Sequence, residues 1–386
     1  MHAIKLKLEN YRNIAAAELE FSRGVNLIYG ANGQGKTNTL EAVNIFAQGR
    51  AFRTRSDKEL VRRTFEPGEP LKGAEEIKAA GGKQLAAAKA AEYAAVLLDF
   101  EDRSGKASYA YYASSDGRNS RMANGVRVRS GADFIGRFRA VLFSPEHLEL
   151  VKGGPNVRRA FFDIAISQLD PLYLGSLSRY LRMVEQRNAL LRGWHSASES
   201  TKAALDTYTP GMAKEAAYIT AARSKYAESA DKYVRKVISD MTSGTEKPAL
   251  NYDGRKSEQD FQQIFDAMRQ RDIDRGTTTC GPHRDELTIT IGGLPARSFA
   301  SQGQQRSIAL ALKLAEGEIC RERCGEYPVF LLDDILSELD PGRRAYIMSC
   351  LNNRQVIITS CENTMDELKS ADSVFRAEGG RIVKVR

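Results

Sequence analysis

Alternating and continuous apolar runs near the two ends of the chain predict short β-strands. Apolar side chains at residues 4, 6 and 8 alternate with lysines, which is typical of a strand with one buried face. Residues 25–29 (Val-Asn-Leu-Ile-Tyr) are more continuously apolar and predict a buried strand, which a glycine-rich turn connects to a helix predicted at 36–48. Strand patterns return at 287–291, 329–332 and 356–359.

The middle of the chain has a helical period. Within residues 172–242, apolar side chains recur at steps of three and four, as at Leu177, Leu181 and Val184. These positions predict two amphipathic helices, joined by a Gly/Ser-rich connection near residues 193–201. An antiparallel helical arm and an ordinary helical subdomain both satisfy this pattern.

Two segments that precede the predicted helices differ in composition. Residues 67–95 are rich in Ala, Lys, Gly and Glu and poor in aromatic residues, which predicts a surface loop with a short helix. Residues 96–128 predict a meander of strands, because the pairs Ser104-Gly105 and Asn124-Gly125 are favourable tight turns.

The turn after residues 25–29 carries the most specific single motif. It reads Gly-Ala-Asn-Gly-Gln-Gly-Lys-Thr, which fits G-x-x-x-x-G-K-[ST] between a predicted strand and a predicted helix. Backbone N–H groups of such a loop surround phosphate oxygens, and the helix N-terminus adds a positive dipole. We expect Lys36 to reach the β- and γ-phosphates of ATP and the Thr37 hydroxyl to bind Mg²⁺. The predicted nucleotide-binding residues here are Gly30, Ala31, Asn32, Gly33, Gln34, Gly35, Lys36 and Thr37.

An apolar strand that ends in two carboxylates is the second candidate element. Residues 329–332 (Val-Phe-Leu-Leu) lead directly into Asp333 and Asp334. Beside a phosphate loop, Asp333 is expected to complete the Mg²⁺ shell with Thr37, and Asp334 to orient or deprotonate the attacking water. The predicted catalytic residues are therefore Lys36, Asp333 and Asp334. A strand end capped by solvated acids is the alternative interpretation.

A third motif, Ser-Gln-Gly-Gln at residues 301–304, precedes a helix predicted at 305–319. Serine and glycine just before a helix N-terminus suit phosphate binding, so we predict that Ser301, Gly303 and Gln304 contact nucleotide. With the phosphate loop, the acidic strand end and a following Ser-Glu-Leu-Asp, the motif order resembles the ATP-binding-cassette ATPases. The resemblance implies an ATP-dependent homodimer in which the serine-glycine motif contacts the γ-phosphate held by the opposite subunit.

The positions of the three motifs along the chain resemble the SMC/Rad50-like branch of these ATPases, with a short helical arm in this chain. The phosphate loop lies near the N-terminus, the other two motifs lie near the C-terminus, and the predicted helices separate them. Runs between about residues 7 and 340 look like the RecF family of bacterial recombination mediators. These runs are residues 8–13 (LENYRN), 57–60 (DKEL), 143–146 (FSPE), 153–155 (GGP), 158–159 (RR), 185–188 (EQRN), 281–285 (GPHRD) and 305–307 (QRS).

The resemblance implies more than nucleotide binding. It implies an ATP-gated dimeric clamp on gapped or junction DNA that helps to load recombinase in recombinational repair, replication-fork maintenance and the SOS response, with RecO and RecR as partners. Weak, DNA-stimulated ATP hydrolysis would act as a conformational switch. Arg12 and Asn13 are expected near the nucleotide, because they follow the first strand much as in related heads. His283 and Arg284 are expected either near nucleotide or DNA, or in a structural turn where Arg284 pairs with Asp285.

The chain also departs from the cassette pattern. Many cassette ATPases have glutamate where Asp334 stands, and the shorter side chain fits slow hydrolysis. Many transporters have a histidine at the switch position after the next strand, where this chain has Thr359-Ser360-Cys361. Residues 67–95 are longer and richer in Ala and Lys than the family resemblance leads us to expect, and the sequence assigns them no role.

The amino-acid composition favours a polyanionic binding partner. The 386 residues include 57 Lys and Arg against 49 Asp and Glu, and the resulting net charge of +8 favours nucleic acid. The five cysteines match no disulfide or zinc-finger framework, which is typical of a reducing compartment. No apolar run is long enough to span a bilayer and no secretory signal is recognisable, so we expect a cytoplasmic protein with no membrane partner.

Two basic clusters are the candidate DNA contacts. Lysines and arginines at such density suit contacts with the phosphate backbone and little reading of base sequence, while a solvated charged face is the alternative. The first cluster consists of Arg50, Arg53, Arg55, Lys58, Arg62 and Arg63, and the second of Arg118, Arg121, Arg127, Arg129, Arg137 and Arg139.

The sequence therefore predicts an α/β fold, in which a cassette-type ATPase head with a mixed sheet and a β-meander carries an inserted, mostly helical arm domain. We predict the N-terminal part of the head at residues 1–150, the helical arm at 151–270 and the C-terminal part of the head at 271–386. The alternatives are a Rad50- or SMC-like ATPase that regulates a nuclease, a transporter cassette, and a non-enzymatic DNA-binding scaffold.

Overall fold

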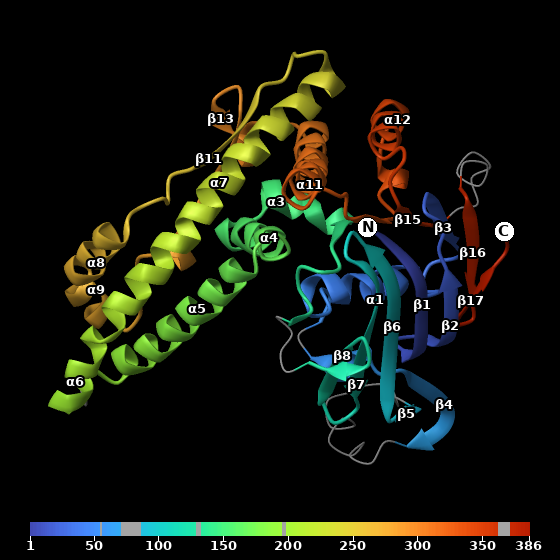
Figure 1. Cartoon of the computed structure of the whole chain (residues 1–386), viewed down its shortest axis with the longest axis horizontal. Coiled ribbons are helices and arrows are strands. Elements are labelled where there is room, and N and C mark those ends of the chain that lie inside the picture. Colours follow the sequence, from blue (N-terminus) through green and yellow to red (C-terminus); the bar gives the residue numbers. More distant parts are fainter. Residues whose placement is uncertain (55, 71–85, 129–132, 195–197, 362–370) are drawn as a thin grey trace. The chain divides into compact units, whose positions relative to one another are not determined.

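The computed structural model describes residues 1–54, 56–70, 86–128, 133–194, 198–361 and 371–386. Their contacts group the chain into two compact units (Figure 1). The first unit consists of Met1–Ser144 and Pro328–Arg386, and the second of Pro145–Tyr327. This grouping differs from the three predicted parts, because the helix after the serine-glycine motif packs along the longest helix of the second unit.

A mixed sheet of twelve strands forms the first unit, in the order β10-β14-β15-β3-β16-β17-β2-β1-β6-β7-β8-β9. The strands β10, β14, β15, β3 and β16 are parallel neighbours. All residues of β14 are buried, as is typical of the apolar strands of a parallel sheet. The bounds are β1 (His2–Tyr11), β2 (Ile14–Glu20), β3 (Val25–Tyr29), β6 (Tyr93–Asp102), β7 (Gly105–Ser114), β8 (Asn119–Ala123), β9 (Val126–Arg127), β10 (Ala140–Phe143), β14 (Val329–Asp333), β15 (Val356–Ser360), β16 (Ser373–Glu378) and β17 (Arg381–Lys384).

Helix α1 (Lys36–Gln48) packs on this sheet and contributes to its main core. Leu40 and Phe46 of the helix belong to the same buried cluster as Leu331 of β14 and Ile357 of β15. The helix ends at Gly49, whose left-handed φ of 71° suits a glycine C-cap. This packing fixes the N-terminus of α1 at the edge of the sheet where β3 ends.

The predicted meander at residues 96–128 is confirmed by the antiparallel strands β6 to β9. Asn124 and Gly125 have φ values of 50° and 77°, as a tight two-residue hairpin turn requires. The described ends of the predicted loop at 67–95 are strands instead, since β4 (Arg63–Pro70) pairs with β5 (Ala86–Ala90). The short helix predicted there is therefore absent from residues 67–70 and 86–95, and residues 71–85 lie outside the described part.

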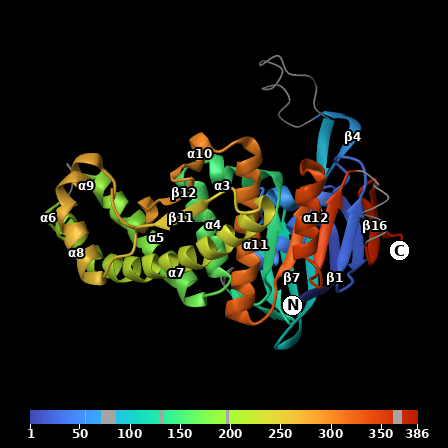
Figure 2. The same cartoon turned by 90° about the horizontal axis from the view of Figure 1, so that it is seen from above.

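The second unit is mostly helical, and its two predicted helices are present. Helix α5 (Pro171–Arg192) and the longer α7 (Tyr208–Thr242) lie side by side (Figure 2). They run antiparallel: Asp170, the N-cap of α5, accepts a hydrogen bond from Tyr218 of α7, whereas Arg179, further along α5, donates to Glu215, which precedes Tyr218 in α7. Among the described residues, no helix has a stretch long and apolar enough to cross a membrane.

Other elements cover α7, so the pair forms the centre of a helical subdomain rather than a bare arm. Helices α4, α8 and α11 and strand β11 all contact α7. Leu181 of α5 is 46% exposed, although the helical period placed it on the apolar side. The remaining elements of this unit are η3 (Pro145–Leu148), α3 (Glu149–Lys152), α4 (Pro155–Ser167), α6 (Glu199–Asp206), β11 (Pro248–Tyr252), α8 (Glu258–Ala267), α9 (Arg269–Arg275), η5 (Pro282–Arg284), β12 (Leu287–Ile291), β13 (Leu294–Pro295), α10 (Ala296–Phe299) and α11 (Gln302–Cys324).

A buried ion pair joins α5 to α9. Arg187 Nη1 donates to Asp272 Oδ2 at 2.7 Å and to Thr278 Oγ1 at 2.8 Å. The side chains of Arg187 and Asp272 are only 2% and 0% exposed. The other oxygen, Oδ1, accepts the backbone N–H of Thr279 at 2.8 Å. Each charge therefore has the partners that a buried ion needs.

Replacing Asp272 by alanine should lower the free energy of unfolding by about 3–5 kcal/mol, because the Arg187 charge would stay buried without its partner. The control is Asp206→Ala, which removes the exposed ion pair with Arg269 and should cost less than about 1 kcal/mol. Urea unfolding followed by circular dichroism measures both. Equal midpoints for the two variants would contradict the prediction.

Candidate functional site

The loop at residues 30–37 joins β3 to α1, as predicted. Its backbone depends on glycine at two points. Gly30 has a φ of 154°, and a Cβ there would lie 2.3 Å from the carbonyl oxygen of Ala377. Gly35 has a φ of 100°, and a Cβ there would lie 2.9 Å from the Asn13 side chain. The loop can therefore hold its backbone N–H groups at the start of α1 only with glycine at these positions.

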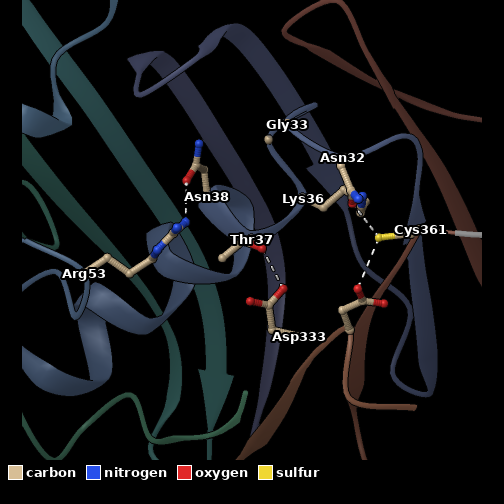
Figure 3. A pocket seen from close by; sticks show the side chains of 10 residues that line it. Asn32, Gly33, Lys36, Thr37, Asn38, Arg53, Asp333 and Cys361 are labelled. Atoms are coloured by element: carbon tan, nitrogen blue, oxygen red, sulfur yellow. Dashed lines mark hydrogen bonds between the residues drawn. The ribbon is translucent and has the colours of Figure 1, made fainter. Parts of the chain in front are cut away.

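Lys36 folds back over this loop. Its ammonium Nζ donates to the carbonyl oxygens of Gly30 at 2.6 Å and Ala31 at 3.0 Å. The side chain is nearly buried but lines the cavity described below (Figure 3). An incoming phosphate would thus meet a cation already held at the loop.

The predicted metal ligands contact each other. Thr37 Oγ1 donates to Asp333 Oδ1 at 2.8 Å, and Thr359 Oγ1 donates to the same oxygen at 2.8 Å. The contact arises because β14 and β15 are parallel neighbours with Asp333 opposite Thr359, while α1 begins at the same edge. A hydroxyl and a carboxylate are the hard oxygen donors that Mg²⁺ prefers, and two protein ligands suit an ion that keeps its waters and binds phosphate. The donor set therefore fits Mg²⁺.

Asp334, directly after β14, has a left-handed backbone with a φ of 50°. Its N–H donates to Thr359 Oγ1 at 3.1 Å, and its Oδ2 lies 3.1 Å from Cys361 Sγ. Non-glycine residues adopt this conformation rarely, and it costs of order 1 kcal/mol or more. The fold thus holds the Asp334 carboxylate on the wall of the cavity at an energetic cost.

Two of the other predicted residues support the loop from outside the cavity. Asn13 Nδ2 donates to the carbonyl of Gly33 at 2.6 Å, and Gln34 Oε1 accepts the N–H of Gly379 at 2.7 Å. Neither side chain lines the cavity. Both connect the loop to neighbouring strands and so help to fix its shape.

Arg12, which we expected near the nucleotide, makes contacts with a carboxylate of α1. Its guanidinium donates to both carboxylate oxygens of Glu41 at 2.9 Å, and Tyr11 OH donates to Glu41 Oε2 at 3.0 Å. Burial and the Glu41 charge raise the pKa of Tyr11 well above its usual value, so its hydroxyl stays a donor. Glu41 is fully buried in α1. In this structure Arg12 therefore anchors α1 to β1 and does not line the cavity.

A cavity of about 210 Å³ lies where the loop, β14 and β15 meet. Seven of the predicted residues line it, and they come from both ends of the chain. Three lining residues were not predicted for this site, namely Asn38, Arg53 and Cys361. Asn38 lies in the first turn of α1, and Arg53 was assigned to the DNA-binding clusters. The predicted lining residues are Asn32, Gly33, Gly35, Lys36, Thr37, Asp333 and Asp334.

Comparison with known proteins identifies the family. Residues 2–382 match the model of the RecF/RecN/SMC N terminal domain. The chain is 33% identical to the DNA replication and repair protein RecF of Geobacillus kaustophilus (strain HTA426) over 99% of each protein. It is 32% identical to the protein of the same name in Bacillus subtilis (strain 168) over the full length of both. The chain belongs to the RecF family. Its members are proteins of DNA replication and repair.

Solved structures agree with this assignment. The recombination mediator protein RecF with ATP, from the RecFOR pathway, is 30% identical with a TM-score of 0.86, over 100% of this chain and 98% of that chain. An Smc head bound to the C-terminal winged-helix domain of ScpA is 16% identical with a TM-score of 0.57, over 100% and 98%. The second likeness shows a shared fold alone. The predicted α/β head with a helical insertion is thereby confirmed as the fold of this RecF-family chain.

The serine-glycine motif of this RecF-family chain lies in the second unit and is not part of the cavity. Ser301 Oγ accepts the N–H of Gln304 at 3.2 Å, and Gln304 Oε1 accepts the N–H of Ser301 at 2.8 Å. This capping box begins α11 and leaves Ser301 exposed. Ser301, Gly303 and Gln304 therefore form the N-terminus of α11, with the Ser301 side chain exposed to solvent.

The GPHRD run at residues 281–285 is one of the runs that look like the RecF family, and it forms a structural turn. His283 lies between Tyr180 OH, 2.8 Å from Nδ1, and the Thr278 carbonyl, 3.1 Å from Nε2. Burial lowers the pKa of His283, so the ring stays neutral at pH 7. Asp285 accepts from Tyr252 OH at 2.5 Å and lies 3.7 Å from Arg223, so the pairing with Arg284 expected from the sequence is not made.

Proposed function

We propose that the chain is a weak, DNA-stimulated ATPase of recombinational repair, which closes as a dimer on gapped or junction DNA when it binds ATP. One observation carries this proposal: a glycine-dependent loop, a lysine ammonium, a hydroxyl–carboxylate pair and a second carboxylate all line one cavity. Each is a part that ATP hydrolysis needs. The family membership supports the same conclusion.

ATP binding would use the loop and Lys36 first. The Lys36 ammonium exchanges the carbonyl oxygens of Gly30 and Ala31 for the β- and γ-phosphate oxygens, and the loop N–H groups surround those phosphates. Thr37 and Asp333 would hold Mg²⁺, which neutralises phosphate charge when bound. Arg53, which also lines the cavity, adds a second cation next to the phosphates.

Hydrolysis would depend on Asp334. The water oxygen forms a bond to the γ-phosphorus while the bond from that phosphorus to the β–γ bridging oxygen breaks. ADP leaves with the electron pair, and the proton of the water passes to the Asp334 carboxylate. Asp334 is one methylene shorter than glutamate, and this shorter reach supports a slow reaction that serves as a switch.

Dimerisation would bring the serine-glycine motif of one protomer to the ATP of the other. The start of α11 is exposed, and its N-terminal dipole and the Ser301 hydroxyl suit the γ-phosphate. ATP can favour the closed dimer only if ATP binds the closed dimer more tightly than it binds the open monomer.

The pathway partners are proposed from the relatives. The recombination mediator RecF with ATP, 30% identical to this chain, is described within the RecFOR pathway. We therefore propose RecO and RecR as partners, recombinase loading and the SOS response as the process, and the cytoplasm as its location. No membrane partner is proposed.

DNA binding would use the first basic cluster rather than the second. In the described part of the chain, Arg50, Lys58, Arg62 and Arg63 have no ion pair. In the second cluster, Arg118 pairs with Asp116 at 3.0 Å and Arg137 with Asp102 at 3.3 Å. Unpaired cations release more counterions on meeting phosphate. Arg55 and Arg129 lie outside the described residues.

The double variant Arg62→Ala/Arg63→Ala should weaken binding to duplex DNA in the presence of ATP and lower the slope of log affinity against log salt by about 2, one unit for each lost phosphate contact. Fluorescence anisotropy of a labelled duplex at several salt concentrations measures this slope. The control Arg118→Ala should change it less, because Asp116 already neutralises that charge.

The same assay separates a switch from a scaffold. Wild-type protein should bind duplex DNA more tightly with Mg·ATP than with ADP. Equal affinity in the two states would favour the non-enzymatic scaffold, and an unchanged salt slope in the double variant would reject the first cluster as the DNA contact.

A further inference from the structure

Cys361 lines the cavity, although the sequence predicted no role for its side chain. It lies directly after β15, and its Sγ is 2.8 Å from Asn32 Oδ1 on the loop and 3.1 Å from Asp334 Oδ2 (Figure 3). The thiol thus connects the phosphate-binding loop to the carboxylate that would activate water. Asn32 and Cys361 are 329 positions apart in the sequence, so only the fold brings them together.

The Cys361 thiol acts in these contacts as a neutral hydrogen-bond donor. Burial and the hydrogen bond to Asp334 raise the pKa of Cys361, and the nearby Lys36 charge only partly opposes them, so the thiol keeps its hydrogen at pH 7. A thiol has a single hydrogen and donates to one oxygen at a time, and the charged carboxylate of Asp334 is the stronger acceptor. The Asn32 amide can present its NH₂ group to the sulfur, since the two ends of an amide are assigned from such contacts.

The orientation of the Asp334 carboxylate depends on few contacts. Its backbone is fixed by the left-handed φ of 50° and by the N–H bond to Thr359. One carboxylate oxygen, Oδ1, is 3.3 Å from Ser337 Oγ, whose shorter contact, 2.7 Å, is with the backbone carbonyl of Asp334. The other oxygen, Oδ2, faces Cys361. The thiol therefore has a large share in setting where this carboxylate points.

We propose that Cys361 is a positioning residue for ATP hydrolysis, whose thiol holds the Asp334 carboxylate toward the attacking water and links it to Asn32 of the phosphate-binding loop. The proposal rests on the ATPase function proposed above. Cys361 itself exchanges no proton with water: the water proton goes to Asp334 while the γ-phosphorus–oxygen bond to ADP breaks. Because an aspartate reaches less far than a glutamate, the orientation of its carboxylate matters more, and a donor fixed at the end of the neighbouring strand compensates for the shorter reach.

Steady-state ATP hydrolysis by Cys361→Ala, Cys361→Ser and the control Cys350→Ala tests the proposal. The alanine variant should lower kcat about tenfold, the effect expected for one hydrogen bond to a charged group, while KM and the Kd for ATP change less than about twofold. Serine keeps a donor at this position and should restore kcat to within about threefold of wild type. Cys350 lies in α12 (Pro341–Cys350), does not line the cavity, and its replacement should leave both constants unchanged.

The outcomes separate this proposal from the function on which it rests. If wild type hydrolyses ATP and Cys361→Ala has the same kcat, the positioning role is wrong and the ATPase function stands. A raised KM with unchanged kcat would make Cys361 a binding residue and would also overturn the proposal. Wild type without ATP binding or hydrolysis would overturn both.

Chemical modification checks the placement of the thiol without a variant. Iodoacetamide labelling of the wild-type protein, read peptide by peptide by mass spectrometry, should be at least about fivefold slower at Cys361 with Mg·ATP than without nucleotide. Labelling of Cys350 should be unaffected. Equal labelling of Cys361 in the two states would place its thiol outside the nucleotide site and would overturn the proposal.

Discussion

Lys36→Ala should reduce the affinity for ATP by at least about a hundredfold, or about 2.7 kcal/mol. The variant loses the charge-assisted contacts with the β- and γ-phosphates, and it also loses the ammonium that bonds to the carbonyls of Gly30 and Ala31 and so helps to shape the loop. Equilibrium binding of a fluorescent ATP analogue measures the change. ATP-dependent dimerisation and tight DNA binding should be lost with it.

The matched control for this variant is Lys7→Ala. Lys7 lies on β1 and is 48% exposed. Its ammonium pairs with Glu18 at 3.3 Å and makes no contact with the phosphate-binding loop. Its replacement should leave ATP affinity unchanged. If Lys36→Ala bound ATP as tightly as Lys7→Ala does, the cavity would not be the nucleotide site.

Asp334→Asn should lower the rate of ATP hydrolysis by a factor of about 10²–10⁴, the usual contribution of a general base, and should leave ATP binding nearly intact. Asparagine has the same shape and tolerates the left-handed backbone at this position, so the fold around it is kept. The variant should accumulate as an ATP-bound dimer, because hydrolysis no longer releases it. Single-turnover phosphate release, combined with ATP affinity, separates the two effects.

The control here is Asp116→Asn, a carboxylate at the β7–β8 turn that pairs with Arg118 and lies outside the cavity. It should hydrolyse ATP at the wild-type rate. A small loss in Asp334→Asn, of less than about fivefold, would mean that another group activates the water.

The parts of the site that could be predicted from sequence are local. The glycine loop, Lys36 and Thr37 are contiguous, so their strand–loop–helix context is recognisable without the fold. Asp333 and Asp334 are recognisable because a fully apolar strand ends in them. The contact between Thr37 and Asp333 follows once β3, which leads into the loop, and β14, which ends in Asp333, are placed in one parallel sheet.

The parts that sequence reasoning missed are set by tertiary packing. Arg53 follows α1 by five residues and looks like a member of a basic cluster, but the turn after Gly49 returns it to the cavity. Cys361 follows a strand where the cassette pattern led us to look for a histidine, so no role was predicted for it. Only the pairing of β15 with β14 and β3 places it beside Asp334 and Asn32. Arg12 was predicted near the nucleotide, but nothing in the sequence shows that the buried Glu41 binds its guanidinium.

The boundaries between the parts of the chain also depend on tertiary packing. The predicted boundaries at residues 150 and 270 rest on changes in period and composition, which do not show what each helix packs against. α11 follows the serine-glycine motif and was assigned to the head, whereas its buried side contacts α7 and groups it with the helices. Long-range packing of this kind leaves no local pattern.

Analytical ultracentrifugation shows whether ATP joins two copies of the chain. Wild-type protein is sedimented without nucleotide, with Mg·ADP and with saturating Mg·ATP, each with and without duplex DNA. We expect the 42.7 kDa monomer in the first two conditions and a particle of twice that mass with Mg·ATP. A monomer at saturating Mg·ATP, with or without duplex, would contradict this expectation.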